Sequence, residues 1–298
     1  MKEKKKKSFL AKFLIGIMSF VMTVLVVFAG FEIYFQAKHD ISLIKAIASV
    51  ASLKDPVDED AKFTSKFGEA DKVSVKEKFN TNVGGELVTI DSNGHLKIDT
   101  SNLTSANQMT GNLVLTDKEL GALINDMLVS QDGGATITMG NMKVGAELVQ
   151  IHLDNLNTET KSVDFNVVLK LDLKEVKKSF SSFPMSLVGN NMPDFLYVSV
   201  TVVVTAQEEA FSYSVAFKDV EINNLDKKQT QNVLKILNLV MKTGSADELC
   251  TTLAESFVNA VLGSEENNGI TYMMKALGAV GFDFQVVNEK TCLVIRIA

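Results

Sequence analysis

The sequence of 298 residues contains no tryptophan, two cysteines, three histidines and a single arginine, Arg296. Planar, two-point recognition of phosphate or carboxylate groups usually uses arginine. The scarcity of arginine therefore argues against an enzyme that acts on phosphorylated substrates. A compositional explanation stays open, because 29 lysines beside one arginine are also expected from an AT-rich genome, and lysine can replace arginine where a point charge suffices.

Histidines and cysteines are too few and too scattered for the common metal sites. His39, His95 and His152 are far apart in the sequence and form no HExxH pattern. Neither Cys250 nor Cys292 has a second ligand at the spacing of a zinc site. We expect no metal and no cofactor, and we interpret His152, on the polar side of an alternating strand, as an exposed imidazole.

Signature motifs of enzymes are also missing. The chain has no GxSxG pattern, no Walker glycine loop and no GxGxxG pattern. The acidic stretch 55–61 lacks the glycine and the terminal glutamate of a calcium loop, and we interpret it as a solvated linker. We therefore expect no catalytic residues and predict that the protein is not an enzyme. An envelope hydrolase is kept as a third hypothesis, for which no acid–base pair or activated nucleophile is visible.

Charge is divided unevenly along the chain. Residues 1–36 hold six lysines and two glutamates, a balance of +4, whereas the remaining residues hold 24 basic and 34 acidic side chains, a balance of −10. The overall charge of −6 argues against a general nucleic-acid-binding protein, which needs a basic face. An acidic outer part stays soluble and repels anionic polymers.

Residues 13–31 form a run of 19 residues without a charge. An α-helix of that length covers about 28 Å, close to the hydrocarbon thickness of a bilayer. Lysine-rich flanks stay in the cytoplasm. We therefore predict a single-pass protein of the cell membrane, with a cytoplasmic basic tail (1–12), a transmembrane helix (13–36), a stalk or linker (37–60) and an extracytoplasmic domain (61–298).

Two alternatives to the anchor are open. A cleaved signal peptide would share the charged start, and Val27-Phe28-Ala29 is an acceptable cleavage site, although the apolar run is longer than usual and continues past it. A cytosolic protein with a buried helix is the other alternative. Outside the membrane, Cys250 and Cys292 can form a disulfide, and two buried thiols are the alternative.

Residues 40–54 have apolar side chains near helical spacing. They predict a short amphipathic helix that continues the membrane helix, lies on the outer leaflet or packs on its own domain. Residues 61–115 are polar, with strand-like pieces such as 73–79, and Asp91–Gly94 predict a hairpin turn. Thr116-Asp117-Lys118-Glu119 is a capping-box pattern and predicts the start of a helix over 117–130.

The central part of the outer chain has a period of two. Apolar and polar side chains alternate over 163–173, 195–205 and 211–217, and the phase shifts near Asp219, where we expect a β-bulge. One-faced strands of this kind are typical of an antiparallel sheet. The helical period returns over 226–280, and the chain closes with a hairpin or strand. The predicted fold is α+β: a single N-terminal transmembrane helix, then a long antiparallel sheet covered by amphipathic helices.

One segment resembles a known family. Leu115-Thr116-Asp117-Lys118-Glu119-Leu120, followed by Leu123-Ile124-Asn125, is similar to the helix that opens the outer domain of YpmS-like membrane proteins of Gram-positive bacteria. The resemblance covers 113–225 and the N-terminal span, and residues 61–110 and the helical C-terminal third depart from it. It implies an extracytoplasmic domain without enzymatic activity.

Two functional hypotheses follow. The first is a membrane-anchored, non-enzymatic interaction or scaffold module at the cell envelope, whose partner is another envelope protein. The alternative is a lipid-binding or lipid-handling ectodomain with an apolar groove between sheet and helices. Six side chains would line this groove, or would form an ordinary core if it is filled: Val163, Phe165, Val167, Val198, Val200 and Val202.

Overall fold

The computed structural model describes residues 22, 29–99, 109–129, 136–139, 142–181, 185–207, 209, 211–241, 251, 274–275 and 277–297. It is an α+β structure with antiparallel sheets, which confirms the predicted fold class at that level. Within these ranges no helix is long and apolar enough to cross a bilayer. Most of the predicted span 13–36 lies outside them, so the span stays a prediction.

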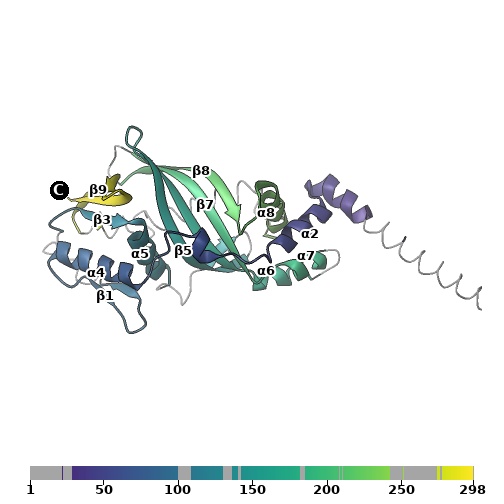
Figure 1. Cartoon of the computed structure of the whole chain (residues 1–298), viewed down its shortest axis with the longest axis horizontal. Helices are drawn as coiled ribbons and strands as arrows, with labels where there is room; N and C mark the ends of the chain where they lie inside the picture. Colours follow the sequence, from purple (N-terminus) through teal and green to yellow (C-terminus); the bar gives the residue numbers. More distant parts are fainter. Residues whose placement is uncertain are drawn as a thin grey trace, which may run out of the picture.

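A long, curved sheet of five antiparallel strands occupies the middle of the molecule (Figure 1). In sheet order, the strands are β4 (Thr136–Met139), β5 (Met142–Asn157), β6 (Ser162–Asp172), β7 (Phe195–Ala206) and β8 (Tyr213–Ile222). The three alternating segments are thus confirmed as strands. The expected bulge is also confirmed, because Val202 pairs with Phe217 while Thr201 pairs with Asp219, which leaves Lys218 without a partner across the pair.

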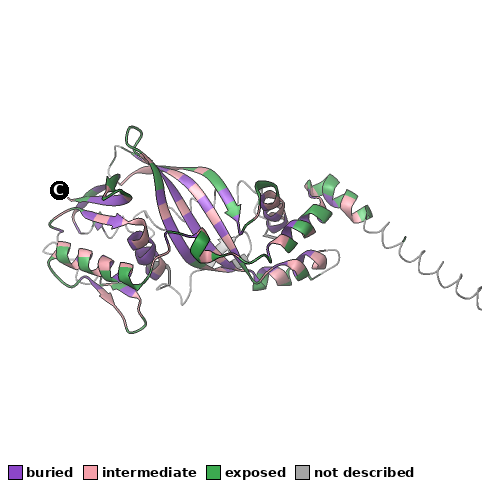
Figure 2. Cartoon of the chain, in the orientation of Figure 1, coloured by how far each residue is buried: buried purple, intermediate pink, exposed green. Residues whose placement is uncertain are grey.

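The alternation along these strands divides the sheet into an apolar face and a polar face. On β7 every second residue from Leu196 to Ala206 is buried, and Figure 2 shows the alternation along the strands. Successive side chains of a strand point to opposite faces, so the buried residues of β7 gather on one side with Phe165 and Val167 of β6. Val168 of β6 is buried on the opposite face, in a smaller cluster with Phe63 and Val149. The side with Phe165 and Val167 belongs to the main hydrophobic cluster of the protein.

One end of the molecule, which we call the mixed end, combines helices and short strands (Figure 1). It contains α4 (Glu69–Val83), α5 (Asp117–Val129), the hairpin β1–β2 (Val88–Ile90 and Leu96–Ile98) and a sheet of β3 (Leu113–Thr116), β10 (Lys290–Ile297) and β9 (Ala279–Val287). The predicted turn at Asp91–Gly94 joins β1 to β2, with Gly94 at a φ of 80°. The closing hairpin is confirmed as β9–β10.

Local signals explain the two helices of the mixed end. The capping box of α5 is confirmed, since the Thr116 amide donates to Glu119 Oε2 at 2.8 Å and the Glu119 amide donates to Thr116 Oγ1 at 3.3 Å. The expectation of a strand over 73–79 is wrong, because these residues belong to α4. Buried Val75 and Phe79 are four residues apart, as on one face of a helix, while Val73 points outward.

The opposite end, which we call the helical end, carries the N-terminal part of the described chain (Figure 1). It contains the helical residues 29–39 and the helices α2 (Leu43–Ser52), α6 (Lys174–Lys178), α7 (Ser186–Asn191) and α8 (Lys227–Met241). Helix α2 packs against α7 and α8, so the amphipathic stretch packs on its own domain. Helix α8 confirms the first of the C-terminal helices, and most of those expected from 246 to 278 lie outside the described residues.

Candidate functional site

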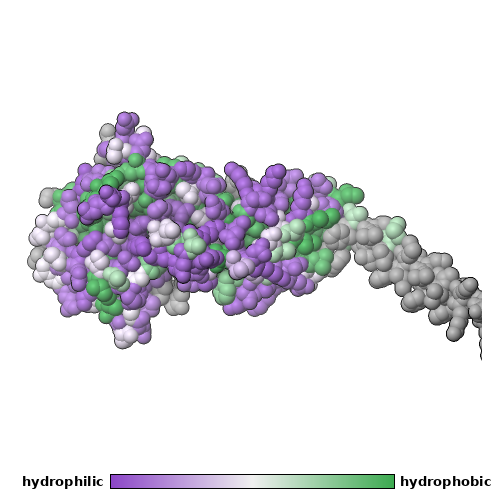
Figure 3. Space-filling view, in the orientation of Figure 1, coloured by the Kyte–Doolittle hydropathy of each residue, from purple (hydrophilic) through white to green (hydrophobic). Residues whose placement is uncertain are grey.

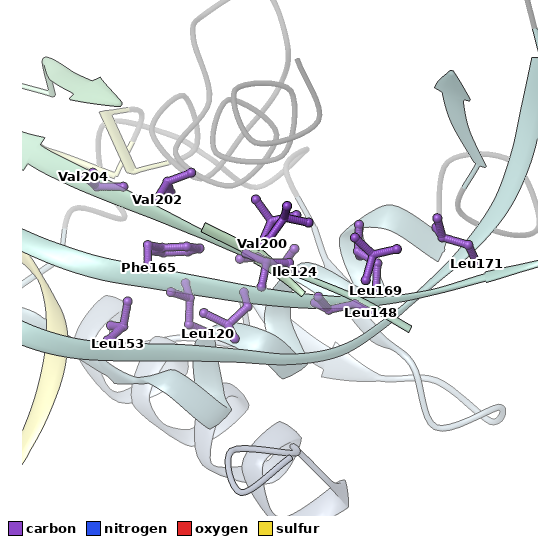
Figure 4. Packing of buried hydrophobic residues seen from close by; sticks show 14 of the residues in the cluster. Leu120, Ile124, Leu148, Leu153, Phe165, Leu169, Leu171, Val200, Val202 and Val204 are labelled. Carbon is purple, nitrogen blue, oxygen red and sulfur yellow. The ribbon is translucent and has the colours of Figure 1, made fainter. Parts of the chain in front are cut away.

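The six residues of the predicted groove lie together on the apolar face of the central sheet. Cross-strand pairing places Phe165 opposite Val202 and Val167 opposite Val200, and Figure 4 shows Phe165, Val200 and Val202 close to one another. Their exposed fractions are between 0 and 6%: Val163, Phe165, Val167, Val198, Val200 and Val202. All six belong to the main hydrophobic cluster, and the structure places none of them at the surface.

Side chains from the mixed end pack against this apolar face. Leu120 and Ile124 of α5 are buried in the same cluster as the six strand residues (Figure 4). The ring of Phe282 on β9 lies 6.4 Å from that of Phe211 and 6.1 Å from that of Tyr213, at the start of β8. Aromatic rings at these separations interact favourably.

Only one of the two cysteines lies in the described part of the chain. Cys292 on β10 is buried, and burial raises the pKa of its thiol. Cys250 lies outside the described residues, so the Cys250–Cys292 bridge stays a prediction.

On the polar face, three segments meet at His152. Its Nδ1 lies 3.0 Å from Asp117 Oδ2 at the start of α5 and 2.9 Å from Ser65 Oγ, and Ser65 Oγ donates to Asp117 Oδ2 at 2.7 Å. The hydrogen bond with Asp117 raises the pKa of His152. Burial alone would raise the pKa of Asp117, but the hydrogen bonds from His152 and Ser65 outweigh it and lower that pKa. The imidazole is therefore half-buried and paired, which corrects the expectation of a freely exposed ring.

Serine, histidine and aspartate are also the residue types of a hydrolase triad, but their geometry here is different. In a triad the carboxylate and the hydroxyl bind opposite nitrogens of the imidazole. Here Asp117 and Ser65 both lie against Nδ1 of His152, and the hydroxyl contacts the carboxylate directly. This arrangement ties α5, β5 and the segment before α4 together.

Most of the acidic stretch 55–61 is exposed, as expected of a solvated linker, but Val57 and Glu59 are partly buried and contact the sheet. Within it, α3 (Glu59–Lys62) lies beside the polar face. Glu59 accepts a hydrogen bond from the Tyr197 hydroxyl and pairs with Lys66 at 3.2 Å and Lys170 at 3.6 Å. The Phe63 ring, just after α3, lies 5.5 Å from that of Tyr197. Charge pairing and aromatic contact therefore hold this segment against β6 and β7.

A polar pocket of about 380 Å³ lies where α3 meets the end of β8 and the start of α8. Lysines and carboxylates line it together: Lys62, Asp219, Glu221 and Lys227. Lys62 donates to the Asn223 carbonyl and lies 3.8 Å from Glu221. One lysine and one carboxylate of this pocket, Lys62 and Glu221, thus pair with each other. Within the described residues, no group of three or more His, Cys, Asp and Glu side chains is arranged to hold a metal ion.

Asp126 forms a buried ionic centre in the mixed end. Its side chain has no exposed surface, and its Oδ2 accepts from the Leu96 amide at 2.7 Å and lies 3.4 Å from Lys72 Nζ. His95 Nδ1 lies 3.3 Å from Oδ1 of the same carboxylate. Lys72 also donates to the Gly94 carbonyl at 2.6 Å. One carboxylate therefore joins α5, α4 and the β1–β2 hairpin.

Glu119 forms a second, nearly buried centre nearby. It accepts from Lys78 Nζ at 2.7 Å and from Ser74 Oγ at 2.5 Å, in addition to its capping-box contacts with Thr116. Burial opposes ionisation of this carboxyl, but the hydrogen bonds from Lys78 and Ser74 outweigh it and lower its pKa. Helices α4 and α5 are thus joined at two carboxylates.

At the helical end, residues 29–39 are attached to the domain by several contacts. Phe35 and Ile41 are buried, and Asp40, with a φ of 52°, turns the chain into α2. Asp40 Oδ2 accepts from Lys235 Nζ of α8 at 2.6 Å. Glu32 Oε2 accepts from the Ile44 amide at 3.1 Å, so a residue of the first helix caps the second.

Comparison of the chain with protein-family models, curated proteins and solved structures finds no match. The resemblance to YpmS-like membrane proteins therefore stays a prediction.

Sequence reasoning missed the polar contacts that join distant segments. Asp126 and Lys72 are 54 positions apart, and no spacing rule connects them. A usable signal did exist for Asp126, because it lies three residues after Leu123, on the same side of α5, and a buried carboxylate needs a partner. No comparable signal links His152 to Ser65.

Proposed function

We propose that the chain is a membrane-anchored, non-enzymatic interaction or scaffold module with its α+β domain outside the cell membrane. The observation that carries this proposal is the junction at the helical end. Three contacts connect the end of the predicted span to the domain: the burial of Ile41 in the main hydrophobic cluster, the Asp40–Lys235 pair and the Glu32–Ile44 hydrogen bond. A module that holds a partner at a fixed distance from a bilayer needs such a rigid mount, whereas a carrier that travels from the bilayer needs a flexible tether.

The burial of the apolar sheet face also supports the scaffold over the lipid-handling alternative. A lipid groove requires apolar side chains that a ligand can reach, and the six candidates are at most 6% exposed. We expect Phe165→Ala to destabilise the domain by about 3–5 kcal/mol, as a core substitution does. A loss well below that range in urea unfolding, together with lipid retained in native mass spectra of the detergent-free domain, would favour the lipid-handling function.

In-cell photo-crosslinking tests the scaffold itself. A photoreactive residue replaces Val286 on β9, which is 61% exposed, or Val73 on α4, which is 43% exposed, both at the mixed end. The scaffold predicts a discrete adduct with an envelope protein from at least one of these positions. The buried Val200, in the same cells, serves as the matched control. Absence of any adduct above that control would contradict the proposal.

A further inference from the structure

We propose that Ile33, Tyr34 and Ile44 form a collar that lies in the headgroup region of the outer leaflet, so that the start of α2 contacts lipid although it follows the predicted span. The inference rests on the proposed membrane anchor and adds to it the surface by which the domain meets the bilayer. Its partner is a phospholipid interface.

The uncharged run that precedes the collar sets the expected position of the outer bilayer interface. The uncharged run 13–31 ends two residues before Ile33, and residues 29–39 are helical without interruption. If the run spans the hydrocarbon, its end lies at the outer interface. Ile33 and Tyr34 then leave the bilayer at headgroup level.

Ile44 is brought back to this level by the fold. The chain turns at Asp40, and the Ile44 amide donates to Glu32 Oε2 at 3.1 Å. A direct hydrogen bond keeps Ile44 close to the depth of Glu32, although twelve residues separate them. Glu32, the charge that follows the apolar run, therefore acts as a cap for α2 at the interface.

The chemistry of the collar suits that depth. Ile33, Tyr34 and Ile44 are 68, 48 and 56% exposed, whereas their apolar neighbours Phe35 and Ile41 are buried, Ile41 in the main hydrophobic cluster. Figure 3 shows hydrophobic side chains at this end of the molecule. Aromatic residues are enriched at membrane interfaces, and the apolar face of an interfacial helix enters the headgroup boundary.

Lys38 lies beside the collar and contacts Tyr34. Lys38 Nζ donates to the Tyr34 hydroxyl at 2.8 Å and lies 5.3 Å from the centre of its ring. Lysines near helix ends direct their ammonium groups to the headgroups while their stems remain on apolar surface. An apolar patch with a lysine at its edge fits a phospholipid interface in both hydrophobicity and charge.

Because the chain has no tryptophan, a single substitution supplies a unique fluorescent probe. The variants Ile33→Trp, Ile44→Trp and Val286→Trp are made in the full chain and reconstituted in phosphatidylcholine vesicles, with and without bromine on the acyl chains. Val286 is the matched control, because it is 61% exposed and lies at the mixed end. We expect blue-shifted emission and quenching by brominated lipid for Ile33→Trp and Ile44→Trp, and neither effect for Val286→Trp.

The outcomes separate the collar from the anchor. Quenching of Ile33→Trp without quenching of Ile44→Trp would overturn the collar and leave the anchor intact. A blue shift of Ile44→Trp without quenching would also overturn it, since the probe would then be covered by protein, such as a second copy of the chain. If brominated lipid quenched neither Ile33→Trp nor Ile44→Trp, the proposed anchor itself would be contradicted. Far-ultraviolet circular dichroism confirms that each variant is folded.

Discussion

The two ends of the molecule are held together by different interactions. In the mixed end, the carboxylates of Asp126 and Glu119 are at most 6% exposed and join α4 to α5. In the helical end, the carboxylate of Asp40 is 89% exposed, and apolar side chains such as Phe35 and Ile41 supply the burial. A buried carboxylate that loses its partner is costly, whereas an exposed ion pair contributes little. The mixed end should therefore be the less tolerant of charge changes.

The largest effect is expected at Asp126. In Asp126→Ala, the Leu96 amide loses its carboxylate acceptor, and the Lys72 ammonium loses its buried counter-ion and keeps only the Gly94 carbonyl and the exposed Glu69. Breaking a buried ion pair in this way typically costs about 3–5 kcal/mol. Urea unfolding measures the loss, with Asp60→Ala as control, because Asp60 also pairs with a lysine but is 91% exposed. Equal stabilities of the two variants would contradict the larger contribution of a buried carboxylate over an exposed one.

A smaller effect is expected at Glu119. Glu119→Gln keeps the shape of the side chain but removes the charge that faces Lys78 and accepts from Ser74. We expect a loss of about 1–3 kcal/mol, the range for a buried hydrogen-bonding group that loses its charged partner. Glu77→Gln on the exposed side of α4 is the matched control, and thermal unfolding distinguishes the two. A Glu119 variant as stable as the control would contradict the role of the second centre.

A still smaller, pH-dependent effect is expected at His152. Its raised pKa means that its contribution to stability is complete below the ordinary histidine value of 6.5 and is lost as the pH rises through the raised value. The lowered pKa of Asp117 means that its contribution is present above 3.8 and is lost as the pH falls through the lowered value. The pair is therefore strongest between about pH 4 and 6.5.

His152→Gln tests this window. Because the imidazole is 41% exposed, screening by solvent limits the expected loss to less than about 1 kcal/mol. Urea unfolding of the native chain and of His152→Gln across the pH range should show the difference near pH 5.5 and its decline in alkaline buffer. A difference that grows as the pH rises would have the wrong sign.

The smallest effect is expected at the helical end. Asp40→Asn weakens the contact with Lys235, but Phe35 and Ile41 remain buried. We expect the free energy of unfolding to be unchanged within experimental error, since exposed pairs contribute little. Chemical denaturation of Asp40→Asn beside Asp126→Ala measures both ends in one series. A large loss at Asp40 would show that the helical end also depends on charge.

The parts of the fold that the sequence predicts are those governed by neighbouring residues. Strand alternation in 195–205, the bulge near Asp219 and the capping box at Thr116 are local patterns, and all three are present. Helix α4 was missed because its apolar residues are few and two of them, Val73 and Val75, also fit a strand. Local periodicity cannot separate the two structures when so few apolar positions are available.

The polar contacts and the packing of the acidic stretch depend on residues that are distant in sequence. The folded chain brings Glu59 to Tyr197 and Ser65 to His152, although each pair is far apart in the sequence. The position of Glu32 was visible as the end of the apolar run, but its role as a cap for α2 required the turn at Asp40. Such pairings follow from topology, which one sequence does not supply.

The proposed function requires that the outer domain stays joined to an N-terminal membrane anchor. The most direct test is the intact mass of the mature chain purified from the membrane fraction of the cells that make it. We predict a mature chain that retains residues 1–29. A mature N-terminus at Gly30 would contradict the anchor, and with it the proposed scaffold and its collar.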